Sequence, residues 1–174
     1  MTAPEFSRVV NLSHCDGREI ELIASAEECA RLAERFELVR IEALHAALLL
    51  TRRGDEIEAN GNFEARFVQT CAVSAEDLPV AVSEPLSLRF VPASAAIPAS
   101  EEEVEIASDE PDEIEYTGTS IDLGEAVAQS LALAIDPFAV GPEAQAVREK
   151  LRGEMDSPFA ALAALRRKPE GEAD

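Results

Sequence analysis

The sequence contains 174 residues, and its 35 acidic and 15 basic side chains give a formal net charge of −20. This charge argues against a surface that follows nucleic-acid phosphates, because such surfaces are built from Lys and Arg, and it favours attraction to basic partners. The length predicts a single domain over residues 1–170, with a disordered tail at 169–174.

The sequence carries no pattern typical of export or membrane insertion. Its first residues, MTAPEFSRVVNLSHCDG, lack a basic start followed by an apolar core. The most apolar stretch, ALHAALLL, is too short to span a bilayer. Cys15, Cys29 and Cys71 are an odd number of widely spaced thiols, which favours reduced cysteines. We therefore expect a cytoplasmic protein.

The first forty residues predict two short strands and a helix. Residues 6–12 and 18–23 have strand character and flank the turn CDG. In the next segment, SAEECARLAERF, Ser25 precedes Glu28 by three residues, which is the spacing of a capping box. Cys29 falls on the apolar stripe of this helix, and we interpret it as a small buried hydrophobe.

Two long strands are expected next. Alternation predicts a strand over residues 37–51, with a bulge near Ala43 where the parity slips by one residue. The segment IEANGNFEARFVQTC contains Asn60–Gly61, a common hairpin dipeptide. A two-residue turn there would set apolar against polar residues, so the parity favours one bent strand with Gly61 at a bulge or close contact. A three-residue loop keeps the parity and stays as an alternative.

A further alternating run over residues 79–91 completes the predicted sheet. Pro79 and Pro85 cannot donate ladder hydrogen bonds, so this strand is expected at an edge. Long alternating strands with short connections predict an antiparallel sheet. The predicted fold class is α+β, with an antiparallel, partly barrel-like sheet, a few peripheral helices and a long acidic loop.

The acidic loop is predicted at residues 93–116. Nine acids lie within 101–116, and no Lys or Arg occurs between Arg89 and Arg148, an interval that holds 13 acids. Such a segment is typical of a solvated flexible loop, and a docking strip for a basic partner is the alternative.

Three helices are predicted after the acidic loop. They lie in TSIDLGEAVAQSLALAIDPF, in PEAQAVREKLR and in SPFAALAALRRK, where Ser157 and Pro158 suit the first positions of a helix.

Few residues indicate a catalytic or metal site. His14, Cys15 and Asp16 are adjacent and point in different directions on an extended chain, and no C-x-x-C pair is present. Cys71 would need His14 or His45 as a base, and nothing in the sequence brings them together. No phosphate-binding glycine loop occurs. We therefore expect no metal, no cofactor and no enzymatic activity.

A basic cluster near the C-terminus leaves direct RNA contact open. Its six members could touch RNA, although solvated helix faces explain them more simply. The cluster consists of Arg148, Lys150, Arg152, Arg166, Arg167 and Lys168.

Several segments in a fixed order resemble the bacterial YceD family of large ribosomal RNA subunit accumulation proteins. They are IEANGNFEARFVQTC, CAVSAEDLPVAVSEPLSLRFVP, an acidic insert, DEIEYTGTSIDLGEAVAQSLALAIDPF and SPFAALAAL, which together cover about residues 55–165. Many family members carry a C-x-R-C pair where this sequence reads CAVS. Here Ser74 stands at the second cysteine and Val73 replaces the basic residue, so Cys71 is interpreted as a buried core thiol.

The resemblance implies a non-enzymatic factor that supports accumulation of 23S ribosomal RNA. Members are often encoded beside a small basic protein of the large subunit. The charge of this chain fits a basic ribosomal protein or an assembly intermediate as partner better than RNA, and neither a membrane nor DNA is expected. The alternative is an RNA-contacting module that uses the basic C-terminal helices. The residues predicted to bind the partner are Glu101, Glu102, Glu103, Asp112, Glu113, Tyr116 and Phe159.

Overall fold

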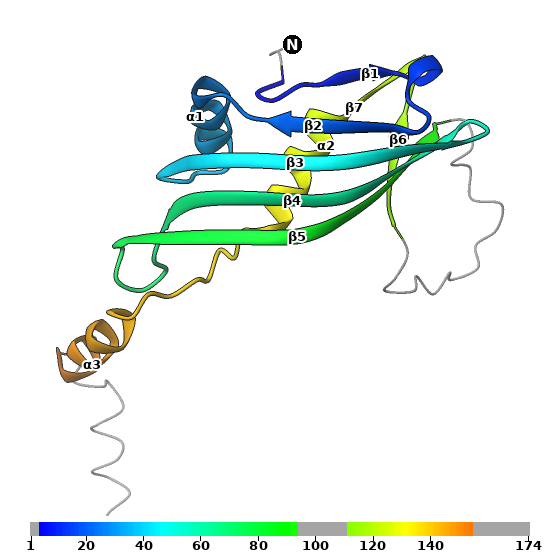
Figure 1. Ribbon diagram of the computed structural model, residues 1–174. Coiled ribbons are helices and arrows are strands. Elements are labelled where there is room, and N and C mark those ends of the chain that lie inside the picture. The colour runs from blue at the N-terminus through cyan, green and yellow to red at the C-terminus, as the bar shows by residue number, and fades with distance from the viewer. Residues whose placement is uncertain (1–3, 94–110, 155–174) are drawn as a thin grey trace, which may run out of the picture.

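The computed structural model describes residues 4–93 and 111–154, which form an α+β domain (Figure 1). In chain order, its elements are β1 (Val9–Asn11), the 3-10 turn η1 (Leu12–His14), β2 (Arg18–Ile23), α1 (Ala26–Arg35), β3 (Arg40–Arg53), β4 (Glu56–Thr70), β5 (Asp77–Pro92), β6 (Asp112–Tyr116), β7 (Ser120–Asp122), α2 (Leu123–Ala134) and α3 (Ala144–Glu154).

The strands form one five-stranded sheet, in the order β2-β3-β4-β5-β6, and one two-stranded sheet of β1 and β7. Strands β2 to β5 are antiparallel neighbours, as predicted, whereas β6 runs parallel to β5. The larger sheet is open, with β2 and β6 at its edges, so the partly barrel-like form expected from the sequence is not confirmed.

The region predicted as a flexible acidic loop is partly a strand. Residues 112–116 form β6, which pairs with Leu88–Pro92 of β5. Ile114 and Tyr116 pack against the core from this strand, whereas Asp112, Glu113 and Glu115 are exposed. Residues 94–110 lie outside the described part, so the prediction for them is not tested.

Strands β3 and β4 confirm the two long alternating runs. Their register shifts between Ile41 and Ala43, at the predicted bulge. β4 continues through Asn60–Gly61, so both the two-residue hairpin and the three-residue loop are wrong there. Gly61 lies opposite Leu48 in the ladder, and a Cβ atom on Gly61 would come within 1.9 Å of the carbonyl oxygen of Ala47.

Strand β5 is an edge over only part of its length. Pro79 and Pro85 lie opposite Val68 and Asn62 of β4, in the part of β5 that has no second neighbour. There the missing proline donors cost no ladder hydrogen bond. The later part of β5 pairs with β6, and the prediction of an edge strand is wrong for that part.

The N-terminal strands do not form a hairpin around CDG. β1 pairs with β7, more than 100 residues later, and the turn η1 separates it from β2. The Asn11 side chain accepts the backbone N–H of Ser13 and so begins this turn. Alternation in the sequence reveals a strand, but it does not reveal such a distant partner.

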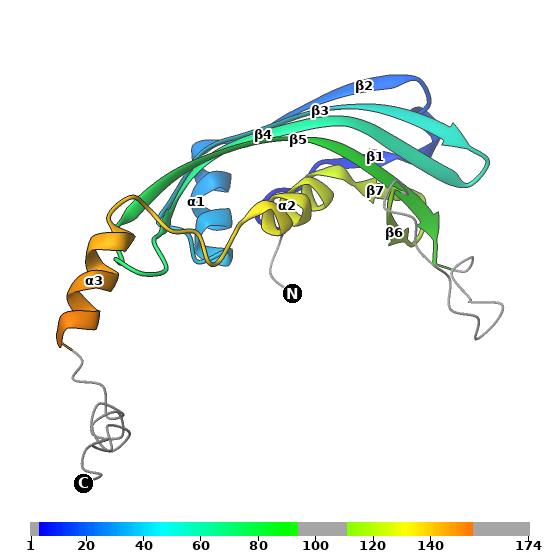
Figure 2. The ribbon, with the colours of Figure 1, turned by 90° about the horizontal axis from the view of Figure 1, so that it is seen from below.

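Helices α1 and α2 cover one face of the curved five-stranded sheet (Figure 2). The capping box of α1 is formed as predicted, by Ser25 and Glu28. Cys29 and Leu32 of α1, with Val127 of α2, belong to the same buried cluster as the inward side chains of the sheet. Among the described residues no helix lies on the opposite face, which we call the outer face.

Helix α3 confirms the predicted short helix and extends beyond the end of the sheet (Figure 2). The last predicted helix, from Ser157, lies outside the described residues. None of the helices in the described ranges is long and apolar enough to cross a membrane.

Candidate interaction surface

Strand β6 carries three of the residues predicted to bind a partner. Asp112 and Glu113 are exposed, and the Tyr116 hydroxyl donates a hydrogen bond to the carbonyl oxygen of Asp55 at 2.5 Å. This bond ties β6 to the turn between β3 and β4, so the predicted role of Tyr116 in binding competes with a structural one. Glu101, Glu102, Glu103 and Phe159 lie outside the described residues.

The acids around β6 divide into structural and free groups. Asp122 caps α2 through the backbone N–H groups of Gly124 and Glu125, which lie 3.0 and 3.3 Å from its Oδ1 atom. Glu125 binds Arg35 of α1 at 2.8 Å, and this contact lowers the pKa of the Glu125 carboxyl. Both carboxylates therefore hold the fold together.

Three acids of β6 remain directed to solvent. Asp112, Glu113 and Glu115 are exposed, and Glu113 lies 3.5 Å from Arg89 on β5. An exposed pair at that distance contributes little and is easily exchanged for another cation. We call Asp112, Glu113 and Glu115 the acidic edge.

The basic cluster is only partly described. Arg148, Lys150 and Arg152 are exposed on α3, where Glu149 lies between them in sequence and is also exposed. Arg166, Arg167 and Lys168 lie outside the described residues. The described part of α3 therefore presents mixed charge.

Cys71 follows β4 directly and lies in the loop before β5. Its side chain is 3% exposed, which confirms the prediction of a buried thiol. Its surroundings differ from those of Cys29, because backbone amides contact the sulfur. The N–H groups of Gly141 and Ser74 donate to Sγ at 3.3 and 3.4 Å. These hydrogen bonds lower the pKa of the Cys71 thiol to about 6, and the one from Gly141 has the largest effect.

The Cys71 loop is also tied to the segment between α2 and α3. Ala72 donates its N–H to the carbonyl oxygen of Ala139, and the Gln69 side chain donates to that of Asp136 at 2.8 Å. The sulfur thus accepts one of several hydrogen bonds that hold this segment against the end of the sheet. The Cys71 sulfur therefore accepts hydrogen bonds from the backbone, and no hydrogen bond in the described ranges joins it to a histidine.

The other candidate ligands do not converge. Cys15 is buried and donates to the carbonyl oxygen of Leu12, whereas Asp16 accepts the backbone N–H of Arg52. His45 pairs with Glu21 at 2.9 Å on the outer face. Within residues 4–93 and 111–154, no three His, Cys, Asp or Glu side chains are grouped so that they could hold a metal ion.

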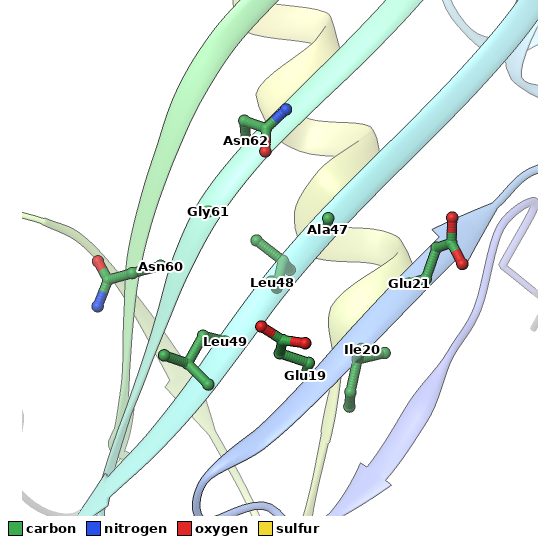
Figure 3. Close-up of a pocket in the computed structure, with 9 residues that line it drawn as sticks. All are labelled: Glu19, Ile20, Glu21, Ala47, Leu48, Leu49, Asn60, Gly61 and Asn62. Atoms are coloured by element: carbon green, nitrogen blue, oxygen red, sulfur yellow. The ribbon is translucent and has the colours of Figure 1, made fainter.

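A hollow of about 560 Å³ on the outer face was not predicted from the sequence (Figure 3). We call it the outer hollow. Alternation indicates that Glu19 and Glu21 share one face of a strand, but only the pairing of β2, β3 and β4 brings them beside the Asn-Gly-Asn segment. The outer hollow is lined by Glu19, Ile20, Glu21, Ala47, Leu48, Leu49, Asn60, Gly61 and Asn62.

Comparison with known proteins gives one family. The sequence model described as "Large ribosomal RNA subunit accumulation protein YceD" matches residues 59–166, more than half of the chain and nearly the segment that carries the resemblance. No match was found among curated proteins or among solved structures. The family's description connects its members with accumulation of large-subunit ribosomal RNA. On this match, the chain belongs to the YceD family.

Proposed function

We propose that this protein supports accumulation of 23S ribosomal RNA by binding a basic protein of the large subunit or an assembly intermediate that displays one. The observation that carries the proposal is the strong negative charge of this chain, taken together with its membership of the YceD family. Thirteen acids and no Lys or Arg lie between Arg89 and Arg148. A stretch of sequence with this charge repels RNA phosphates and attracts cationic proteins.

The acidic edge supports the proposal within the described residues. Its three carboxylates project from a strand at the margin of the sheet, next to the acidic insert in sequence. Charges placed in this way raise the association rate with a basic partner and the specificity for it more than they raise the affinity. The insert, including Glu101, Glu102 and Glu103, is proposed to extend the same field, and Phe159 is proposed to add an apolar contact.

Binding rather than catalysis is proposed as the working activity, in the cytoplasm where ribosomes are assembled. The family's description names an accumulation factor and no reaction. The amide contacts of Cys71 support a structural role for this thiol.

Affinity purification of the full chain at increasing salt tests this function. We expect large-subunit proteins to be retained at low salt and lost as salt rises, because exposed charges are screened. Replacing Asp112, Glu113 and Glu115 by the corresponding amides should weaken retention, whereas Glu27→Gln with Glu34→Gln on α1 should have less effect. Salt-insensitive binding, or equal losses in both variants, would contradict the proposed role of the acidic edge.

Direct RNA binding through α3 is the alternative function. It predicts crosslinks between RNA and Arg148, Lys150 or Arg152, and loss of association after nuclease treatment. The exposed glutamates near these residues give it no specific support.

A further inference from the structure

The outer hollow lies where two rows of side chains cross three strands. One row consists of Glu19, Leu49 and Asn60, and the other consists of Glu21, Ala47 and Asn62. Figure 3 shows these residues on the side of the sheet turned away from α2. Each row therefore carries a carboxylate at one end, an apolar side chain in the middle and an amide at the other end.

A small residue leaves the hollow open. Ala47 occupies the centre of the second row and carries only a methyl group. Leu49 is 45% exposed at one margin of the hollow, so apolar surface is available to an incoming group. In the described ranges, the His45 ring lies beside Glu21 and no Lys or Arg pairs with either carboxylate, and the lining itself contains neither Lys nor Arg.

The geometry fits a cationic side chain with an aliphatic stem. Residues two apart on a strand are separated by about 7 Å, so Glu19 and Glu21 can flank one guanidinium or ammonium group. The stem of Arg or Lys can lie along Leu49 and Ala47, because such stems pack on apolar surface while the charged end stays near water. Asn62 then offers an amide donor and acceptor to a neighbouring backbone, and Asn60, whose Oδ1 accepts from Ser87 Oγ at 2.8 Å, offers its amide N–H groups.

We propose that the outer hollow binds an extended, basic polypeptide segment, with an Arg or Lys side chain held between Glu19 and Glu21. The charge and shape of the lining favour this occupant over RNA, because the phosphates of RNA would face two carboxylates. The inference depends on the proposed function in one respect, namely that the partner is basic. The site itself is separate from the acidic edge.

Peptide binding to the full chain tests the outer hollow directly. The probe is a fluorescein-labelled peptide of alternating Arg and Val, measured by fluorescence anisotropy at low salt. Glu19→Gln with Glu21→Gln should weaken binding about threefold or more, since two exposed charge contacts are lost. Glu27→Gln with Glu34→Gln removes the same charge from α1, on the opposite face, and should leave the affinity within about twofold of the unmodified chain.

A second pair of variants tests the shape without changing the charge. Ala47→Tyr should weaken peptide binding, because the larger side chain fills the hollow. Tyrosine is well tolerated in strands, and Ala47 is at an exposed strand position, so the variant should fold. Ala81→Tyr places the same side chain on the outer face of β5, away from the hollow, and should bind as the unmodified chain does. Circular dichroism checks that both variants are folded.

The outcomes separate this inference from the proposed function. Equal weakening by both glutamate pairs, unchanged binding by Ala47→Tyr, or displacement of the peptide by an RNA oligonucleotide would overturn the outer hollow as a peptide site. If Glu19→Gln with Glu21→Gln leaves peptide affinity unchanged while the full chain still retains large-subunit proteins, the hollow fails and the proposed function stands. If the peptide binds at the hollow but the full chain retains no ribosomal protein, the proposed function fails instead.

Discussion

Gly61 leaves no room for a side chain between β3 and β4, and we expect Gly61→Ala to destabilise the sheet. A Cβ atom there would lie 1.9 Å from the carbonyl oxygen of Ala47 and 3.1 Å from the Cα atom of Leu48. Both contacts are with backbone, so no rotamer change can relieve them. The two strands would have to separate by about 1.5 Å or more before ordinary contact distances are restored.

The cost follows from the ladder and from the packing. A separation of about 1.5 Å would stretch nearby N–H···O distances beyond the usual 2.7–3.2 Å, and each lost bond costs about 1 kcal/mol. Overpacking in a well-packed region costs about 1–3 kcal/mol. Alanine recovers about 0.5–1 kcal/mol, because glycine is unfavourable in a strand interior. The expected net loss is about 2–3 kcal/mol, or about 5–10 °C in Tm for a chain of this size.

Urea denaturation followed by circular dichroism measures this loss in the free energy of unfolding. Asn62→Ala is the matched control, because Asn62 is an exposed neighbour of Gly61 on the same strand. This control should stay within about 0.5 kcal/mol of the unmodified chain. If Gly61→Ala is as stable as the control, the close approach of β3 to β4 is wrong.

Three further perturbations test contacts elsewhere in the fold. Arg8 lowers the pKa of Glu28 to about 2, so the unmodified chain should be more stable than Glu28→Gln by about 2 kcal/mol at pH 7. Urea titrations should show this advantage shrinking as the pH falls from about 4.5 towards 2; an advantage that persists at pH 2 would refute the ion pair. Because the pKa of Cys71 is lowered from 9.0 to about 6, the stability of the unmodified chain relative to Cys71→Ser should rise between pH 6 and 9, and a constant difference would contradict the amide contacts. Gly124→Ala should lower Tm despite the better helix propensity of alanine, since its Cβ would lie 2.8 Å from the backbone nitrogen of Arg8; a rise in Tm would count against this packing.

Local patterns in the sequence predict most of the elements correctly. The capping box at Ser25, the bulge near Ala43 and the continuous strand through Gly61 each depend on residues close together in the chain. Alternation is a reliable guide there, because a shift of one residue would turn the apolar side chains of β4 to solvent.

Long-range pairing could not be predicted in the same way. β1 pairs with β7, and β6 adds to β5 in parallel, after a connection rich in acids. The three acids of Asp112–Tyr116 suggest a loop, but this segment is strand β6. Ile114 and Tyr116 alternate with the acids, and that period of two is the available signal for a strand.

The candidate surfaces are predicted in part. The exposure of Asp112 and Glu113 agrees with the predicted role in binding but does not test it, and the Tyr116 hydroxyl is bonded to Asp55. The amide contacts of the Cys71 sulfur include one from a segment 70 residues away, so no local pattern indicates it. The outer hollow likewise depends on the register of three strands, which the sequence does not specify.

Affinity purification of the full chain from nuclease-treated cells tests the central claim most directly. The chain is proposed to act through a basic protein partner, so large-subunit proteins should remain bound after the RNA is digested and should dissociate when the salt concentration is raised. Loss of every ribosomal protein on nuclease treatment alone, with intact ribosomal RNA recovered from the untreated sample, would contradict the account.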